Sequence, residues 1–442
     1  MEGTNKKNFT VPLLLIMVGA LMFLPNLGKV HLFDWDEINF AECAREMIIA
    51  KQYFMVTINY LPFWEKPPLF IWMQAFSMSV LGVSDYAARL PNAICGIATL
   101  LLLFHVGKTF KDSRFGLLWV FAYVGSILPH FYFKSGIIDP WFNFFIFTGI
   151  YFFARYRMQQ KNILEGKANK LIILSALCIG LAVLTKGPVA LLVFSLTVII
   201  YWLLQNRKAP ITFIHASLFA LVFILAGGSW FAAEILTGHW ATVVEFFQYQ
   251  VRLFNTGDSG HGGPFYFHFI ILLLGCFPAS IFAIRGMLIK KDEDAKINEA
   301  RLWMGILFWV VLILFSIVKT KIIHYSSLCY YPLTFFAALA IYKILFENEA
   351  WKKWMSWGLG IIGGIIGIAL VGLPIFGMNK QVILSSGIIK DPFAAANLLA
   401  NVNWSLADCI MGGFLLVTLI VVLVSIRQKK FKMGVFGIFL GT

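Results

Sequence analysis

Acidic and basic side chains gather in residues 34–68, between long apolar segments of the chain. The stretch contains DWDEINFAECAREM and, further on, FWEKPP. Its carboxylates can accept a proton, and its ammonium and guanidinium groups can bind an anion. Ionisable groups are costly beside apolar segments and mark functional sites in membrane proteins. The stretch is therefore the first candidate for a catalytic site.

Further polar residues lie near the ends of later apolar segments. They are Asp139, Lys186, Arg252, His261, Lys319, Lys321, His324 and Tyr325. If these ends share one side of a membrane, the acids and bases form a site that handles an anion and a proton. A lipid-linked phosphate needs both features, because its charge pairs with lysine or arginine while its tail lies between helices.

The composition is that of a membrane protein. Of 442 residues, 60% are hydrophobic and 13% are charged, and the mean hydropathy is +0.80. Soluble domains average about 25% charged residues, so soluble classes are excluded. The six cysteines include no CxxC pair, which favours small core residues over a disulfide framework or a metal site. The chain is predicted to be an all-α polytopic membrane protein.

Twelve apolar segments of roughly membrane-spanning length set the predicted helices. They lie near residues 11–29, 86–106, 115–133, 138–154, 171–185, 188–205, 211–233, 265–284, 302–318, 327–345, 355–377 and 404–425. The last residues, FKMGVFGIFLGT, resemble the opening of a thirteenth helix, so the chain is expected to be truncated at its C-terminus. The prediction is thus a bundle of about 12–13 transmembrane helices.

Lysine and arginine alternate between the predicted loops. One set of loops holds 24 of the 36 basic residues and is therefore cytoplasmic by the positive-inside rule. The net charge of +14 is thus a signal of topology and not of nucleic-acid binding. The opposite, external face carries the clusters described above, in loops that include residues 30–85 and 234–264.

Two amphipathic helices are predicted within residues 30–85. In the first, Phe40, Ala44 and Met47 recur at helical spacing, whereas Glu42, Arg45 and Glu46 are expected to face away from them. The second is expected to begin after Pro67-Pro68 and to end at Gly82. Both helices can lie on the membrane surface, or they can simply cover the end of the bundle.

A series of short motifs gives the chain a family resemblance. DEINFAECAREM, FWEKPPLFIWM, ARLPN, LTKGPVAL, GHGGPFYF and KTKIIHY occur in this order over roughly residues 30–345. Together they resemble the membrane-embedded polyprenyl-phosphate-sugar glycosyltransferases, which include the aminoarabinose transferase of lipid A and the protein O-mannosyltransferases. The resemblance implies a GT-C fold, with residues 1–442 as one membrane-embedded domain. Residues 30–85 would form the first external, catalytic loop, and residues 234–264 a later external loop.

The resemblance implies roles for two aspartates. Asp36 matches the aspartate that acts on the acceptor and deprotonates it when the acceptor is a hydroxyl. Asp139 resembles a second acidic, catalytic position. Each can instead cap the helix that follows, Asp139 with Pro140 in the first turn, and capping is compatible with catalysis.

The resemblance also implies a set of substrate-binding residues around the donor phosphate. Lys66 matches a phosphate-binding lysine, and the adjacent Glu65 would orient it or hold a divalent metal ion; a surface ion pair is the alternative. Trp64 stands where the family has phenylalanine. Glu37, directly after Asp36, is placed in the same set.

Three later residues complete this set. Arg252 resembles an arginine that pairs with the phosphate, or is a solvated loop charge. Lys321 and Tyr325 resemble the ends of a KLPxY segment in which this chain has lost the proline, so the turn can differ. His261 is either a second metal ligand or a structural histidine. Lys186 would hold its turn or a head group.

The predicted function is transfer of a sugar from a polyprenyl-phosphate donor to a lipid, glycan or protein acceptor, with inversion at the anomeric carbon and Asp36 as the base. The resemblance places the enzyme in the bacterial inner membrane with its site on the periplasmic face, and it includes lipid A, and so lipopolysaccharide, among the acceptors. It allows a divalent metal ion as the one cofactor. The alternative is a transporter, flippase or binding protein for such lipid-linked sugars. That alternative predicts internal repeats and broken helices at mid-membrane. The sequence shows neither a clear repeat nor an acidic pair in the middle of a helix, and its acids cluster in an external loop.

Overall fold

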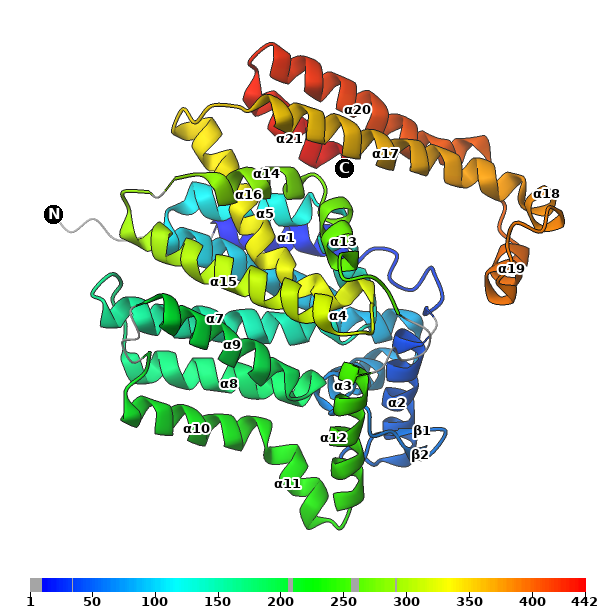
Figure 1. The fold of residues 1–442 in the computed structure, drawn as a ribbon. Helices are drawn as coiled ribbons and strands as arrows, with labels where there is room; N and C mark the ends of the chain where they lie inside the picture. The colour runs from blue at the N-terminus through cyan, green and yellow to red at the C-terminus, as the bar shows by residue number, and fades with distance from the viewer. Residues whose placement is uncertain (1–9, 34, 206–209, 256–261, 291) are drawn as a thin grey trace.

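Helices make up nearly all of the protein, whose computed structural model is drawn in Figure 1. The structure describes residues 10–33, 35–205, 210–255, 262–290 and 292–442. Within these ranges the one sheet is a hairpin of two short antiparallel strands, β1 (Thr57–Ile58) and β2 (Leu61–Pro62). The prediction of an all-α membrane protein is confirmed.

The first half of the chain forms helices that run between two ends of the molecule. Their bounds are α1 (Thr10–Phe23), α2 (Asp36–Ala50), α3 (Leu69–Leu81), α4 (Asp85–Phe110), α5 (Ser113–Val124), α6 (Ile127–Phe131), the 3-10 turn η1 (Tyr132–Lys134), α7 (Asp139–Gln160), α8 (Ala168–Lys186) and α9 (Val189–Leu204). Helix α8 packs between α7 and α10, as Figure 1 shows.

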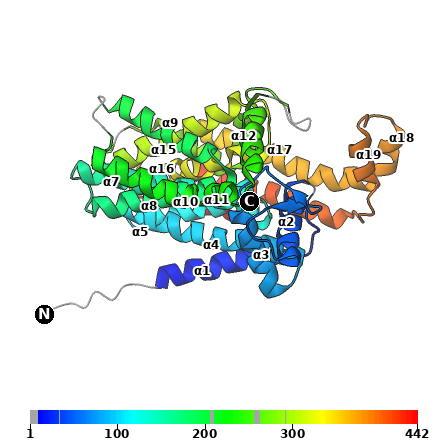
Figure 2. The same ribbon diagram turned by 90° about the horizontal axis from the view of Figure 1, so that it is seen from below.

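The second half adds the outer helices and two external segments. Their bounds are α10 (Phe213–Gly227), α11 (Ser229–Leu236), α12 (Trp240–Asn255), α13 (Phe267–Gly275), α14 (Ala279–Leu288), α15 (Ala295–Ile317), the 3-10 turn η3 (Ile323–Cys329), α16 (Tyr330–Phe346), α17 (Lys353–Met378), α18 (Lys380–Ser385), α19 (Pro392–Leu399), the 3-10 turn η4 (Leu406–Cys409), α20 (Ile410–Arg427) and α21 (Phe431–Gly441). Figures 1 and 2 both show α18 and α19 beyond the end of the main bundle.

All twelve predicted apolar segments coincide with a helix or with a bent pair of helices. Among the described residues, six helices are long and apolar enough to cross a membrane, and counting each bent pair as one span raises the number to nine. The other three segments are α1 and α9, which are shorter, and α7, which carries Asp139 at its start. A total of twelve to thirteen spans therefore remains a prediction.

Three of the predicted spans are not single helices, because each is broken by a sharp bend. The chain turns by 85° after α5, by 54° between α10 and α11, and by 110° between α13 and α14. Apolar composition is the same on both sides of each bend, so hydropathy alone cannot reveal a change of direction.

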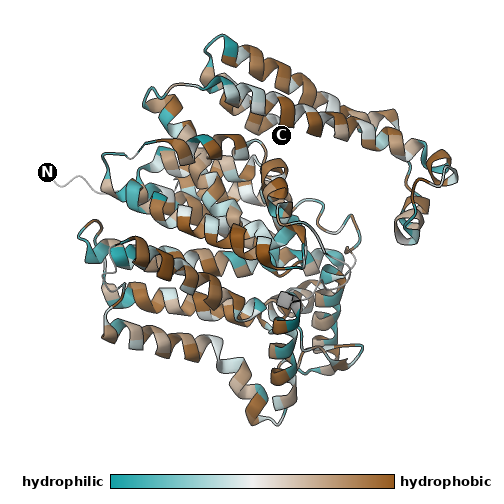
Figure 3. Cartoon of the chain, viewed as in Figure 1, coloured by the Kyte–Doolittle hydropathy of each residue, from teal (hydrophilic) through white to brown (hydrophobic). Residues whose placement is uncertain are grey.

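Hydropathy is distributed along the helices as a lipid environment requires. Figure 3 shows apolar residues along the helix shafts and hydrophilic residues gathered at the ends. Large apolar side chains such as Ile365 of α17 and Val417 of α20 are exposed on the outer helices. Without a hydrophobic cost of exposure to lipid, such faces are stable.

The first external loop folds against the end of the bundle. Helix α3 follows Pro68 and ends at Gly82, as predicted. In α2, Glu42 and Arg45 pair at the partly exposed surface. Glu46 was predicted on that outer face but is fully buried, because the β1–β2 hairpin folds over it.

The hairpin supplies hydrogen bonds to one oxygen of the buried Glu46 carboxylate. Its Oε2 atom accepts hydrogen bonds from the hydroxyl of Thr57 at 2.7 Å and from the backbone N–H of Tyr60 at 3.0 Å. Helical periodicity could not foresee this contact, since it comes from residues after the helix. The later external loop, residues 234–264, contains α12, a helix that the sequence analysis did not predict.

Candidate active site

Four segments that are distant in the sequence meet at the external end of the bundle. Asp36 is the first residue of α2, Asp139 is the first of α7, and Lys186 is the last of α8. The turn η3 brings His324 to the same place, within 4 Å of both aspartates. The structure therefore places the two predicted catalytic acids beside each other.

Neither aspartate caps its helix. The residue before α2 is Trp35, with φ of 68°, and the residue before α7 is Ile138; neither helix has a side-chain cap hydrogen bond. A positive φ is uncommon for a residue with a side chain, and such turns concentrate at functional sites. Both carboxylates are turned toward side chains of other segments instead.

The two acids share one histidine. The Nε2 atom of His324 lies 3.5 Å from Oδ2 of Asp36 and 3.6 Å from Oδ2 of Asp139. The ammonium of Lys186 donates to Oδ1 of Asp139 at 2.6 Å. The side chain of Asp36 is 31% exposed and that of Asp139 only 3%, so Asp36 is the more accessible of the two acids.

Lys66 lies on the other side of this group. Its Nζ atom is 3.6 Å from Oε2 of Glu65 and 5.1 Å from the ring centroid of Tyr249, whose hydroxyl donates to the same Glu65 oxygen at 2.9 Å. Burial lowers the pKa of the Lys66 ammonium, and the Glu65 carboxylate partly offsets this effect. A buried cation with one weak pairing is suited to bind an anion.

A cavity of about 500 Å³ lies between these groups and the surrounding helices. Its polar lining includes Lys66, Asp139 and Lys186, and α9, α12 and α15 supply apolar walls. The lining residues are Lys66, Asp139, Phe142, Asn143, Lys186, Pro188, Val189, Leu192, Phe247, Gln250, Val251, Phe315, Val318 and Tyr325. Two cations in an apolar cleft fit a phosphate that carries a long hydrocarbon chain.

Two predicted substrate-binding residues lie at the edge of this cavity. Tyr325 lines it, with its ring centroid 4.8 Å from Nζ of Lys186. Arg252 is exposed on α12, and its guanidinium carbon lies 5.0 Å from the ring centroid of Tyr249. Arg252 is therefore one aromatic ring away from Lys66, and its predicted contact with the phosphate remains a prediction.

Glu37 is engaged elsewhere in the structure. It is 2% exposed, and its two oxygens accept from Nη2 of Arg89 at 2.7 Å and from Nε of Arg89 at 3.1 Å. The same carboxylate accepts from the backbone N–H groups of Phe33 and Gly136. These bonds give Glu37 a structural role, and its predicted substrate contact stays untested.

The ARLPN motif fixes the loops that carry the acids. Besides Glu37, Arg89 donates to the carbonyl oxygens of three residues of the first loop, Leu27, Val30 and His31. Asn92 donates to the carbonyls of Ser135 and Ile137, just before Asp139. The motif thus acts through positioning, which the sequence pattern did not indicate.

Lys321 is also occupied by the protein itself. Its ammonium donates to the backbone carbonyls of Phe315, Ser316 and Val318 at 2.6–3.0 Å. Burial lowers the pKa of this ammonium. Lys321 therefore closes the C-terminal end of α15, and the structure does not bring it into the lining of the cavity.

Only one of the two predicted metal ligands, Glu65, lies among the described residues. His261 lies outside the described residues, so its position relative to Glu65 is not defined. Among the described residues, no group of three or more histidine, cysteine or carboxylate side chains is arranged to hold a metal ion. The Lys66 ammonium beside Glu65 also disfavours a second cation at that carboxylate.

Three contributors to the site were missed or left undecided by sequence reasoning. His324 occupied a variable place in its motif, Lys186 was undecided between its turn and a head group, and Tyr249 drew no attention. The position of Lys186 just before Gly187 and Pro188, at the end of an apolar segment, was the available signal. For Tyr249 only the helical spacing of apolar residues in α12 could have helped.

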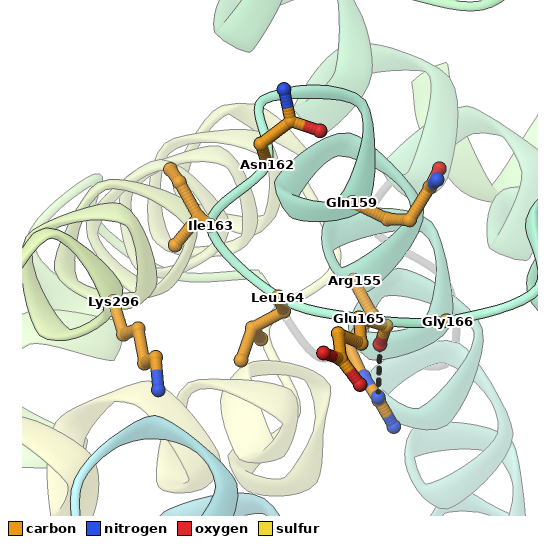
Figure 4. Close-up of a pocket in the computed structure, with 8 residues that line it drawn as sticks. All are labelled: Arg155, Gln159, Asn162, Ile163, Leu164, Glu165, Gly166 and Lys296. Carbon is orange, nitrogen blue, oxygen red and sulfur yellow. Dashed lines mark hydrogen bonds between the residues drawn. The ribbon is translucent and has the colours of Figure 1, made fainter.

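A larger cavity, of about 750 Å³, opens at the opposite, cytoplasmic end (Figure 4). It is lined by Arg155, Gln159, Asn162, Ile163, Leu164, Glu165, Gly166 and Lys296. Arg155 donates to the carbonyl of Glu165 at 3.1 Å, which closes the loop after α7. No pair of adjacent acids faces this cavity, so size alone does not identify the active site.

Comparison with known sequences agrees with the motifs. Residues 65–230 match the dolichyl-phosphate-mannose-protein mannosyltransferase family. A similar curated protein is the undecaprenyl phosphate-alpha-4-amino-4-deoxy-L-arabinose arabinosyl transferase of Pectobacterium atrosepticum. It is 25% identical over 412 residues, which cover 88% of this chain and 72% of the relative.

Comparison with solved structures supports the fold. ArnT from Cupriavidus metallidurans, in a crystal structure bound to undecaprenyl phosphate, aligns with a TM-score of 0.72 at 19% identity, over 98% of this chain and 76% of that one. An oligosaccharyltransferase of Archaeoglobus fulgidus aligns with a TM-score of 0.52 at 12% identity, over 80% of this chain and 54% of that one. The predicted resemblance and the GT-C fold are confirmed.

Proposed function

We infer that this chain is a membrane-embedded glycosyltransferase that moves a sugar from a polyprenyl-phosphate donor to an acceptor on the external face of the membrane. One observation carries the inference. An apolar cavity at the external end of the bundle is lined by the buried Lys66 and by Lys186, whose side chain is 15% exposed, and a pair of aspartates lies beside these two ammonium groups. The motifs, the fold and the similar arabinosyl transferases support the same conclusion.

Donor binding follows from the lining of the cavity. The phosphate would lie against Lys66, with Lys186, Arg252 and Tyr325 near it, while the prenyl chain follows the apolar walls toward the lipid. The leaving group is already a stable anion, so it needs no proton from the enzyme. Cations that are fixed before the reaction stabilise the charge that grows on the departing phosphate.

Asp36 would act on the acceptor. If the acceptor is a hydroxyl, its oxygen attacks the anomeric carbon, the bond from that carbon to the phosphate breaks, and Asp36 takes the hydroxyl proton. A single in-line attack inverts the anomeric carbon. A phosphate acceptor, as on lipid A, is already a nucleophile, and Asp36 would then mainly position it. Asp139 would support this arrangement from its buried site.

The resemblance to the arabinosyl transferases makes lipid A, and so lipopolysaccharide, the first acceptor to test. It also places the enzyme in the bacterial inner membrane with its site on the periplasmic face. A divalent ion held by Glu65 and His261 stays a separate proposal, since Glu65 alone of the two is described. Loss of transfer on treatment with a chelator, and its recovery with added metal ion, would support it.

The decisive experiment compares wild-type protein with Asp36→Asn in sugar transfer from a radiolabelled polyprenyl-phosphate sugar. The variant should bind donor normally and transfer more slowly by about 10²–10⁴-fold, the range of general acid–base catalysis. Equal rates would show that the acid is elsewhere. Retention of the anomeric configuration would refute the in-line attack. Binding of donor without transfer by wild type would favour a flippase or a binding protein.

A further inference from the structure

His324 holds a position that no motif explains. Its Nε2 atom faces Oδ2 of Asp36 at 3.5 Å and Oδ2 of Asp139 at 3.6 Å. Both Nε2 of His324 and Oδ2 of Asp139 are buried and have no hydrogen-bond partner within usual limits. Buried polar atoms without partners are rare in native proteins, and each calls for an explanation.

The arrangement has a simple chemical consequence. An imidazole nitrogen without hydrogen presents a lone pair, and a lone pair aimed at two carboxylate oxygens is repelled by both. A hydrogen on Nε2 turns both contacts into attraction. The Lys186 ammonium on the other oxygen of Asp139 favours the ionised carboxylate, so the proton belongs to the histidine rather than to this acid.

A network of buried hydrogen bonds holds the backbone that carries His324. The hydroxyl of Ser327 donates to the carbonyl of His324, and its oxygen lies 3.0 Å from the hydroxyl of Tyr132. The amide of Asn143, one turn into α7, donates to Ser327 at 2.7 Å. This buried network ties η3 to the helix that begins with Asp139, so the distance from histidine to acid is built into the fold.

From these contacts we propose that His324 is a positioning residue, which carries a hydrogen on Nε2 and holds Asp36 and Asp139 side by side at the edge of the cavity. Without it, the two carboxylates would repel each other, and Asp36, the more exposed of the pair and the first residue of α2, would turn away. Lys66, Lys186 and Tyr325 are the other polar groups of this region. The proposal rests on the proposed function, because it assigns Asp36 its orientation toward the acceptor.

The test uses two substitutions in the full-length protein. His324→Leu removes the N–H group at similar size, whereas His324→Gln keeps an amide that can donate to both carboxylates. We expect kcat to fall about 10²-fold in the leucine variant, the cost of a misplaced catalytic group, with KM for the donor little changed. The glutamine variant should recover most of the loss. A control, His268→Gln, alters a buried histidine that contacts Ser326 and should leave kcat close to wild type.

A side chain that merely fills space would behave differently. In that case the leucine variant would be as active as the glutamine variant or more so, which would overturn the proposal. Nitrogen NMR of histidine-labelled protein in lipid bilayers gives a readout without activity. The signal that disappears in His324→Gln should be that of a protonated Nε2, and an unprotonated Nε2 would contradict the proposal even if wild type transferred no sugar. Failure of transfer by wild type would instead refute the proposed function.

Discussion

The external cavity and the cytoplasmic end of the bundle use the same charged residues in opposite ways. At the cytoplasmic end Lys111, Asp292, Lys343 and Glu347 form an ion-pair cluster in which each lysine contacts both acids at 2.7–3.7 Å. In the external cavity, Lys66 has a single acid at 3.6 Å and otherwise faces a ring and an open space. Every charge of the cluster is paired within the protein, whereas the Lys66 ammonium is weakly paired and faces a cavity that can hold an anionic ligand.

Residue type alone therefore does not distinguish a structural ion-pair cluster from a ligand-binding site. Lysines of both regions lie at helix ends and are largely buried. What differs is whether the partners supplied by the protein saturate each charge. Buried ion pairs fix a geometry, and unsaturated buried charges create a binding site.

The largest effect is expected from a substitution that breaks the ion pair between Glu37 and Arg89 near the external end of the bundle. Arg89→Met leaves the Glu37 carboxylate buried without its cation, at a cost of about 3–5 kcal/mol. Thermal unfolding of the purified protein should shift strongly downward, and transfer should be lost. An unchanged unfolding temperature would show that the pair does not hold the loop.

A double variant separates structure from substrate binding at this pair. Arg89→Met with Glu37→Leu removes the unpaired buried charge, although the carbonyl oxygens of the first loop still lose the Arg89 donor. If Glu37 is only structural, the double variant should regain part of the stability and some transfer. Regained stability without donor binding would support the predicted substrate contact of Glu37.

The next prediction concerns how donor binding at Lys66 depends on pH. Since burial lowers the pKa of Lys66 below the ordinary 10.5, its charge is present at low pH and is lost as pH rises through that lowered pKa. Affinity for undecaprenyl phosphate should therefore fall as pH rises through that lowered pKa, at a pH below 10.5. Lys66→Arg, which stays charged, should keep its affinity over this range. If affinity fell in the same way with pH in wild type and in Lys66→Arg, the titrating group would be a residue other than Lys66.

The smallest effect is expected at the cytoplasmic cluster. Glu347 is partly exposed, with 34% of its side chain accessible, and solvent weakens its pairing with Lys111 and Lys343. Glu347→Gln should change stability by no more than about 1 kcal/mol and leave sugar transfer unaltered. A large loss of transfer in this variant would mean that the two ends of the bundle are coupled.

The sequence predicted the parts of this architecture that depend on local pattern. Helix α3 begins after Pro68 and ends at Gly82 because proline and glycine act through their own backbone preferences. The apolar segments form helices, and several of the polar residues near their external ends, among them Asp139, Lys186 and His324, come together. The position of Asp36 at a helix start was likewise visible from local sequence.

Contacts between distant segments could not be read from the sequence. The pairing of Glu37 with Arg89 joins residues 52 positions apart, and the contact of His324 with Asp139 joins different helices. Helical periodicity predicted that Glu46 lies on the outer face of its helix, but the β1–β2 hairpin, which comes later in the chain, buries it. Lys321, whose motif suggested phosphate binding, instead bonds nearby backbone carbonyls at the end of α15, a local contact that the motif did not indicate.

The central claim, that the external cavity binds the donor phosphate through the weakly paired Lys66 ammonium, is tested most directly by one binding measurement. The dissociation constant of undecaprenyl phosphate would be compared for wild type, Lys66→Met and Lys343→Met in lipid nanodiscs. Loss of one charged hydrogen bond should weaken binding by about 10- to 150-fold in Lys66→Met. The cytoplasmic control, Lys343→Met, should bind within about twofold of wild type. Equal affinity of wild type and Lys66→Met, or equal weakening in both variants, would contradict the account.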